Sequence, residues 1–167
     1  MMLSVPGYQL LGEIHQAANS VVYRGRREQD ALPVIVKIHQ AEAPGSEELV
    51  RFKREFEIAR SLQDLPGVVR VLGLHCLDKR LALVMEDCEA ESLSIWAKKK
   101  TFTLEEVLSI ARQAVDILEG IHAAGVVHKD IKPAKTWIAP AGLLVSPPPT
   151  LSSVHNIRLD LDIVDLY

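Results

Sequence analysis

Cysteine is scarce in this chain of 167 residues, which holds only Cys76 and Cys88. Their separation matches no zinc-ligand spacing, and so few thiols indicate a protein of a reducing compartment rather than a disulfide-bonded secreted domain. The six histidines are scattered and include no HxxxH pair. A histidine-rich metal site is therefore not expected.

Long apolar runs and a strong charge of either sign are also missing. The sequence has no signal peptide and no run of about 18 apolar residues, the length that would indicate a membrane span. Its net charge is −3, with a pI near 6.1. The one basic cluster, Lys98–Lys100, is most simply a solvated loop. We therefore expect a soluble cytoplasmic protein that binds neither a membrane nor nucleic acid.

Apolar residues are plentiful, at 48% of the chain, so a real core is expected. The length allows one domain, or one complete lobe and part of a second. No internal repeat is present. The only biased segment, residues 146–153, contains Pro147–Pro149 and is typical of a loop or of disorder.

Residues 32–38, with the sequence LPVIVKI, are predicted to form a strand, because β-branched residues lie on both sides of a single lysine. That lysine is Lys37. An unpaired buried ammonium group is costly, so Lys37 needs a partner. The element that follows residues 32–38 along the chain is the candidate to supply this partner.

A helix with Ser46 as a plausible N-cap is predicted to follow. Apolar residues recur in it at helical spacing: Leu49, Phe52, Phe56, Ala59 and Leu62. Glu55 and Glu57 both lie in this helix, but about 200° apart around its axis. Only one of the two can face Lys37.

Two further elements lie downstream. Residues 81–88, LALVMEDC, read on their own as a core strand that ends in an acidic turn. A long helix is predicted from Thr103, which forms a capping box with Glu106. His122, near the end of this helix, is expected to be a core histidine rather than a ligand. The helix has an apolar stripe broad enough for burial: Leu104, Val107, Leu108, Ala111, Val115, Leu118 and Ile121.

The chain then reads VVHKDIKP over residues 126–133, where a turn presents an acid, Asp130, and two residues later a base, Lys132. Three residues such as HKD recur by chance, but here the upstream elements come in a specific order. Lys37 and Asp130 are 93 residues apart (130 − 37). The ordered set resembles the eukaryotic-type protein kinase domain over roughly residues 8–138.

This resemblance implies a role for each polar motif. Asp130 would act on the proton of the substrate hydroxyl, and Lys132 would steady charge on the transferred phosphoryl group. Lys37 would hold the phosphates of ATP. The sequence of residues 54–58, REFEI, resembles the family motif in which the glutamate at the position of Glu55 pairs with the strand lysine, here Lys37.

The resemblance also implies an adenine pocket. Met85 would stand beside it as the gatekeeper residue, and the backbone from Glu86 to Cys88 would hydrogen-bond the adenine edge. The remaining nucleotide-binding candidates are Leu11, Gly12 and Val22.

Three residue-level features depart from the family pattern. The glycine positions of the phosphate loop carry His15, Ala17 and Ser20, so close approach to phosphate is less free. Ile35 replaces an alanine that lines the adenine pocket, which predicts a tighter cleft. Lys135 stands where an asparagine should bind the metal, and its positive charge would repel Mg²⁺.

The fourth departure is the end of the chain, where only 37 residues (167 − 130) follow Asp130 and no DFG motif occurs. Asp165 has an apolar neighbour as in DFG, but it lies about 16 residues further along the chain than the family pattern requires. We therefore expect its resemblance to DFG to be a chance one. The composition changes near Ala139. We expect a chain that leaves the kinase pattern there, by truncation or by a misread gene model.

We therefore predict an α+β, protein kinase-like fold. Residues 8–88 would form a small lobe with a five-stranded antiparallel sheet, a helix and the hinge. Residues 89–138 would begin a helical large lobe, and residues 139–167 would form a departing tail. A competent domain would transfer the γ-phosphoryl group of ATP to Ser or Thr hydroxyls of a protein substrate, with Mg²⁺; in this chain we expect impairment.

Two alternatives stay open: a pseudokinase that binds signalling partners without catalysis, and a truncation product that does not fold alone. The sequence of residues 11–23 is also similar to that of kinase-like domains at the N-terminus of multi-sensor signalling proteins, which carry ATPase and histidine-kinase modules. Neither the substrate nor the upstream signal can be read from the sequence.

Overall fold

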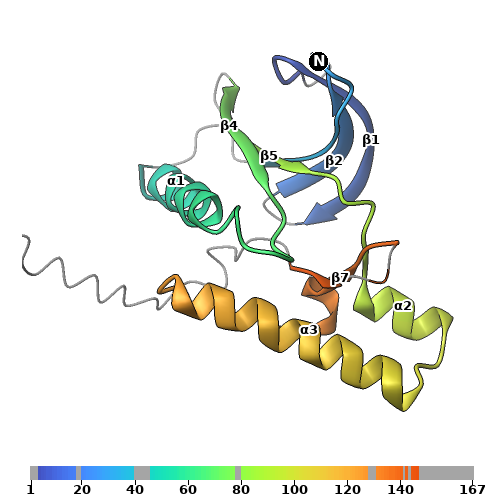
Figure 1. The fold of residues 1–167 in the computed structure, drawn as a ribbon. Helices are drawn as coiled ribbons and strands as arrows, with labels where there is room; N and C mark the ends of the chain where they lie inside the picture. The colour runs from blue at the N-terminus through green and yellow to red at the C-terminus, as the bar shows by residue number, and fades with distance from the viewer. Residues whose placement is uncertain are drawn as a thin grey trace, which may run out of the picture.

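The computed structural model describes residues 4–17, 20–39, 46–77, 80–127, 131–140, 142 and 144–146, with the backbone alone at residues 17, 46–49 and 51. Figure 1 shows a curved antiparallel sheet with one helix beside it, and below them a long helix with a shorter one at its side. No helix in the described ranges is long and apolar enough to cross a membrane.

The sheet has five strands in the order β1-β2-β3-β5-β4, and every neighbouring pair is antiparallel. The strands are β1 (Tyr8–Ala17), β2 (Ser20–Arg27), β3 (Pro33–His39), β4 (Val71–Leu77) and β5 (Arg80–Glu86). Side chains alternate between the two faces along β3. Val34, Val36 and Ile38 enter a buried cluster on one face, while Ile35 belongs to a second cluster on the other.

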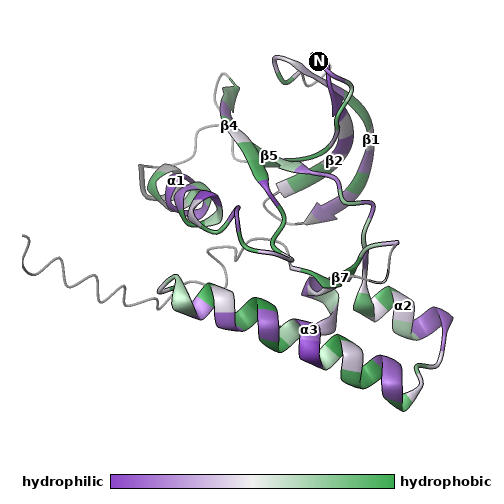
Figure 2. Ribbon diagram, viewed as in Figure 1, coloured by the Kyte–Doolittle hydropathy of each residue, from purple (hydrophilic) through white to green (hydrophobic). Residues whose placement is uncertain are grey.

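Helix α1 (Ser46–Ser61) covers the face of the sheet that carries Ile35. The predicted apolar spacing is confirmed, because Phe52 and Ala59 are buried against residues of the sheet. The side chain of Ser46, the predicted cap, lies outside the description. Beside α1, Figure 2 shows apolar stretches along β4 and β5.

The second part of the chain is mostly helical. It contains α2 (Leu93–Lys99), α3 (Leu104–Ala123) and the short 3₁₀ helix η1 (Pro133–Lys135). Three short strands form a small sheet in the order β6-β7-β8: β6 (Glu91–Ser92), β7 (Trp137–Ile138) and β8 (Leu144–Val145). The predicted capping box is confirmed, since Thr103 Oγ1 accepts from the Glu106 N–H at 3.2 Å and the Thr103 N–H donates to Glu106 at 2.9 Å.

The predicted burial of the apolar stripe on α3 is largely wrong. Ile121 is buried, but the stripe is exposed at Leu104, Val107, Leu108 and Val115. The face of α3 that packs into the core instead carries Ile117 and Ile121. His122 is exposed rather than in the core. The reason is that α3 is apolar on two faces, and only one of them meets the elements that the structure describes.

The two parts are joined by the segment between α1 and β4, which lies against α3 and β8. The Ser146 N–H donates to the Gly67 carbonyl at 2.7 Å, and the Val69 N–H donates to the Ser146 carbonyl at 3.0 Å. Gly67 has a φ of +79°, and a Cβ there would lie 2.5 Å from Cδ1 of Ile117. Glycine at position 67 therefore allows the segment between α1 and β4 to pack against α3.

The predicted architecture is confirmed: a five-stranded antiparallel sheet with its helix, followed by the start of a helical lobe. The proposed boundaries at residues 88 and 138 stay predictions. β8 lies beyond the second boundary and pairs with β7.

Candidate functional site

Lys37 and Glu55 form the centre of the candidate site. Nζ of Lys37 lies 3.2 Å from Oε1 of Glu55, which confirms the predicted ion pair between strand and helix. Glu55 is buried, with 5% of the residue exposed, whereas Glu57 is exposed. Glu55 is therefore the partner, because helical geometry turns Glu57 towards solvent.

An aromatic ring supports this pair. Nζ of Lys37 lies 5.8 Å from the centroid of the Phe52 ring, one helical turn before Glu55. The Lys37 side chain keeps 21% of its surface exposed. Its ammonium group is thus held in place by Glu55 and Phe52, while the side chain keeps some contact with solvent.

The residues predicted to line an adenine pocket lie together. Ile35 and Met85 are opposite each other in the β3–β5 pairing and belong to one buried cluster. Val22, which pairs with Lys37 across β2 and β3, and Cys88 pack against the same cluster. The side chain of Ile35 fills space that an alanine would leave open, which agrees with the expected tighter cleft.

The predicted hinge, residues 86–88, is fixed by backbone and side-chain contacts. The Glu86 N–H donates to the Arg70 carbonyl and the Asp87 N–H to the Pro33 carbonyl. Within the described part of the chain, the Cys88 N–H makes no hydrogen bond, so it can donate to a ligand. Burial, with the charges of Glu86 and Asp87, raises the pKa of the Cys88 thiol, so the thiol is neutral at pH 7.

No sequence motif indicates a role for the side chain of Asp87, which the structure places at the hinge. This side chain is 5% exposed, and its carboxylate accepts from Nε of Arg24 at 2.6 Å and from the Glu89 N–H at 2.9 Å. The pair ties the hinge to β2. The 63 residues between Arg24 and Asp87 explain why no local pattern reveals the contact.

The predicted phosphate loop between β1 and β2 is only partly described, because residues 18 and 19 lie outside the description. Leu11 is 54% exposed and Gly12 is exposed, and the β1–β2 register shifts on both sides of Gly12. A Cβ added at Gly12 would meet no atom within 4 Å. The exposed edge of β1 is therefore open to a ligand at Gly12.

Asp130, the predicted catalytic acid, lies outside the described residues together with His128 and Lys129. Lys132 is exposed, and its carbonyl accepts from the Lys135 N–H at 2.8 Å at the start of η1. Lys135 is half-buried and lines a small hollow of about 30 Å³ with Ile117 and Leu144. The structure thus turns Lys135 towards α3 and β8.

The residues that the structure describes do not fit a Mg²⁺ site. Among the described residues, no group of three His, Cys, Asp or Glu side chains comes together to hold a metal ion. Lys135 supplies no oxygen ligand. The DFG aspartate would be expected about 16 residues before Asp165, where the sequence has Pro147–Pro149, just after β8.

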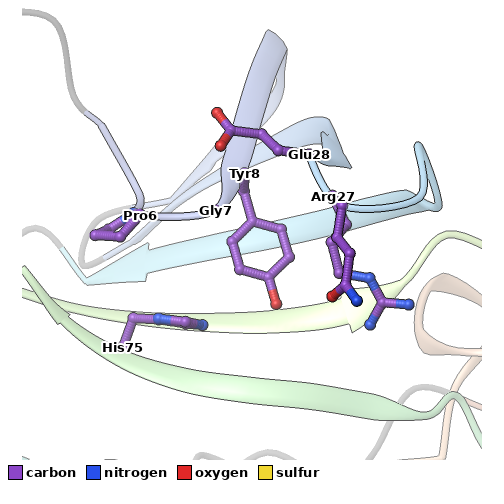
Figure 3. Close-up of a pocket in the computed structure, with 7 residues that line it drawn as sticks. Pro6, Gly7, Tyr8, Arg27, Glu28 and His75 are labelled. Atoms are coloured by element: carbon purple, nitrogen blue, oxygen red, sulfur yellow. The ribbon is translucent and has the colours of Figure 1, made fainter.

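A further hollow lies elsewhere in the described structure. It has a volume of about 510 Å³ and lies against the start of β1 and the end of β2. Figure 3 shows Tyr8 and His75 at this hollow, and their ring centroids are 5.2 Å apart. Tyr8 packs against the cluster on the sheet face opposite α1, so this hollow is separate from Lys37 and Glu55.

Comparisons with known proteins agree with this geometry. The family model described as "Protein kinase domain" matches residues 8–141. The chain is 31% identical over 135 residues to serine/threonine-protein kinase 36 of Pongo abelii, covering 81% of this chain and 10% of that protein. It is 32% identical over 139 residues to a probable serine/threonine-protein kinase of Clostridium perfringens, covering 82% of this chain and 20% of that protein.

A third relative, serine/threonine-protein kinase TIO of Arabidopsis thaliana, is 25% identical over 143 residues, which are 86% of this chain and 11% of that protein. The chain thus spans between a tenth and a fifth of the length of these three relatives. The expected similarity to multi-sensor signalling proteins stays a prediction.

Proposed function

The chain belongs to the eukaryotic-type protein kinase domain family, of the serine/threonine kind, and from that premise we propose that it binds ATP between its sheet and its hinge. The observation that carries the proposal is the Lys37–Glu55 ion pair, at 3.2 Å and on a largely buried carboxylate. Lys37 would hold the α- and β-phosphates, and Glu55 would hold Lys37 in reach of them.

The adenine ring would lie on apolar side chains near the hinge. Val22, Ile35 and Met85 offer the apolar surface, and the unused Cys88 N–H offers a hydrogen-bond donor for the adenine edge. Leu11 and Gly12 would cover the nucleotide from β1. Burial of Ile35 predicts that this pocket is narrow and that binding is weak.

Phosphoryl transfer by this chain is proposed to be impaired. Transfer depends largely on positioning and on Mg²⁺ that neutralises the developing charge. Asp130 and Lys132 keep the residue types needed to act on the substrate hydroxyl and the phosphoryl group. Lys135 and the proline run 147–149 replace both metal-ligand positions. These two replacements favour a second candidate function, a nucleotide-binding pseudokinase that acts through protein partners in the cytoplasm.

Calorimetric titration with ATP tests the binding proposal. We expect Lys37→Ala to weaken ATP binding by about tenfold or more, because a charged hydrogen bond to phosphate is lost. Lys53→Ala is the matched control, since Lys53 is an exposed lysine on the same helix as Glu55. Equal affinity in wild type, Lys37→Ala and Lys53→Ala would contradict the assignment of Lys37.

Radiolabelled ATP with a generic protein substrate tests the impairment. We expect no transfer above background in wild type, and none in Lys135→Asn, because the proline run still lacks a metal ligand. Asp130→Ala serves as the blank. Transfer by wild type that disappears in Asp130→Ala would show a working kinase and would remove the pseudokinase alternative.

A further inference from the structure

Asp87, in the middle of the hinge, is held by hydrogen bonds to three separate residues. Its N–H donates to the Pro33 carbonyl of β3 at 3.1 Å. Oδ2 of its carboxylate accepts from Nε of Arg24 on β2 at 2.6 Å, and Oδ1 accepts from the Glu89 N–H at 2.9 Å. The side chain is only 5% exposed, so the carboxylate needs these partners to offset its loss of contact with water.

These contacts fix the backbone on either side of Cys88. Asp87 precedes Cys88 and is tied to β2 and β3. Glu89 follows Cys88 and has a φ of +52°, in the left-handed region that a residue with a side chain seldom adopts. The hydrogen bond from the Glu89 N–H to the Asp87 carboxylate stabilises that conformation. The Cys88 N–H therefore lies between two anchored residues.

Arg24 lies on the face of the sheet that carries the candidate adenine pocket. It is opposite Ile35 in the β2–β3 pairing and two residues from Val22, so side-chain alternation places it on the same face as Val22. Ile35 and Val22 both belong to the apolar surface of the proposed pocket. The Arg24 side chain is 49% exposed, so its removal leaves the core intact. Arg24 can therefore influence the pocket through the hinge rather than through the packing of the core.

We propose that Arg24 is a positioning residue for adenine recognition: by holding Asp87, it keeps the Cys88 N–H directed at the edge of the base. This inference rests on the proposed function, because it requires ATP to bind at the hinge. A donor that is fixed before the ligand arrives costs no ordering on binding.

A fixed donor also selects between bases. N1 of adenine accepts a hydrogen bond, whereas N1 of hypoxanthine, the base of inosine triphosphate (ITP), carries a hydrogen and cannot accept one there. A site built to hydrogen-bond one base discriminates against a base that leaves its buried donor unpaired. The Cys88 N–H, held through Asp87 by Arg24, therefore favours ATP over ITP.

Calorimetric titration with ATP and with ITP tests the proposal. The two nucleotides share their ribose and triphosphate, so the ratio of their affinities reports on the base alone. We expect wild type to prefer ATP. Arg24→Ala should weaken ATP binding by roughly fivefold and change ITP binding by less than about twofold. A general loss of folded structure would weaken both nucleotides equally, so the ratio separates positioning from stability.

Three further variants serve as controls. Arg27→Ala is the matched one, because Arg27 also lies on β2 and forms an ion pair, but with Asp30, three residues along the chain. It should leave both affinities unchanged. Lys37→Ala should weaken ATP and ITP by the same factor, because Lys37 is assigned to the phosphates. Arg24→Lys should recover part of the preference for ATP, since an ammonium group can still pair with Asp87.

A double-mutant cycle tests whether Arg24 acts through Asp87. Asp87→Ala should lower the preference for ATP at least as much as Arg24→Ala, because it also releases Glu89. In the Asp87→Ala background, Arg24→Ala should have no further effect on either nucleotide. Thermal unfolding checks that each variant folds. If Asp87→Ala does not fold, Asp87→Asn takes its place, since it keeps an oxygen that accepts from the Glu89 N–H.

Several results would overturn the proposal. Equal affinity of wild type for ATP and ITP would do so, as would an Arg24→Ala variant that binds ATP normally or loses both nucleotides alike. These results would leave the assignment of Lys37 standing. Additive losses in the cycle would show that Arg24 does not act through Asp87. Failure of wild type to bind either nucleotide would instead remove the proposed function, and this inference with it.

Discussion

Lys37 and Glu55 carry opposite charges at a position with little access to water. The side chain of Glu55 is 7% exposed and that of Lys37 21%. Removing one member of such a pair leaves the other charge in a poor solvent. Because Lys37 keeps some contact with water, the cost is smaller than for a fully buried pair.

We expect Glu55→Ala to lower the free energy of unfolding by about 1–3 kcal/mol. Glu57→Ala, two residues along α1 and exposed, should change it by less than about 0.5 kcal/mol. Urea denaturation measures both. Equal losses in the two variants would show that the ion pair contributes nothing specific to the fold.

Gly67 is the second residue whose identity the geometry requires. It combines a φ of +79° with a close approach of Ile117, whereas Gly125 has a φ of +75° and open space around it. Comparing the two positions separates backbone strain from steric overlap.

We expect Gly125→Ala to cost about 1 kcal/mol, for the left-handed backbone alone. Gly67→Ala should cost about 2–4 kcal/mol, because Ile117 also has to move in a packed core. Thermal unfolding of the two variants tests this comparison. Equal losses in the free energy of unfolding would mean that the segment around Gly67 packs loosely against α3.

At the scale of elements, the start of α3 is stabilised by charge. Hydrogen bonding from Lys100, and then from the Thr103 N–H, lowers the pKa of Glu106 below its usual 4.5. A carboxyl group whose pKa is lower in the folded state stabilises the fold above the ordinary pKa. That stabilisation is lost as the pH falls through the lowered value.

We therefore expect Glu106→Gln to be less stable than wild type at pH 7, with a difference that narrows below about pH 4. Glu119→Gln, an exposed position near the other end of α3, should show little change at either pH. Denaturation curves at pH 7 and at low pH measure this, at dilute protein. A constant difference across pH would show that Glu106 acts by packing rather than by charge.

The elements differ in how well their sequences predict them. The β-branched residues around Lys37 predict β3, and the capping box predicts the start of α3, because both signals are local. The buried face of α3 was not predictable, since its apolar residues cover two faces and the choice depends on which neighbours are present. The contact between Arg24 and Asp87 was missed because it joins distant parts of the chain.

At the scale of the whole molecule, the order of the motifs predicts the family and the fold, since each motif occupies a separate element. Spacing along helix α1 decides between Glu55 and Glu57 only once the family pattern is used, and the structure agrees. The arrangement of Asp130 relative to Lys37 does not follow from spacing, because it depends on how two lobes meet. Residues 128–130 lie outside the described ranges, so that arrangement stays a prediction.

We propose that the sheet and hinge hold ATP through Lys37 and Glu55 without a dedicated metal site. Thermal-shift titration with ATP, in magnesium and then in chelator, tests it most directly, because a ligand that binds the folded state raises its unfolding temperature. We expect a small rise of similar size in both conditions, reduced in Lys37→Ala. A large rise that requires magnesium, or no rise at saturating ATP, would rule out this mode of binding.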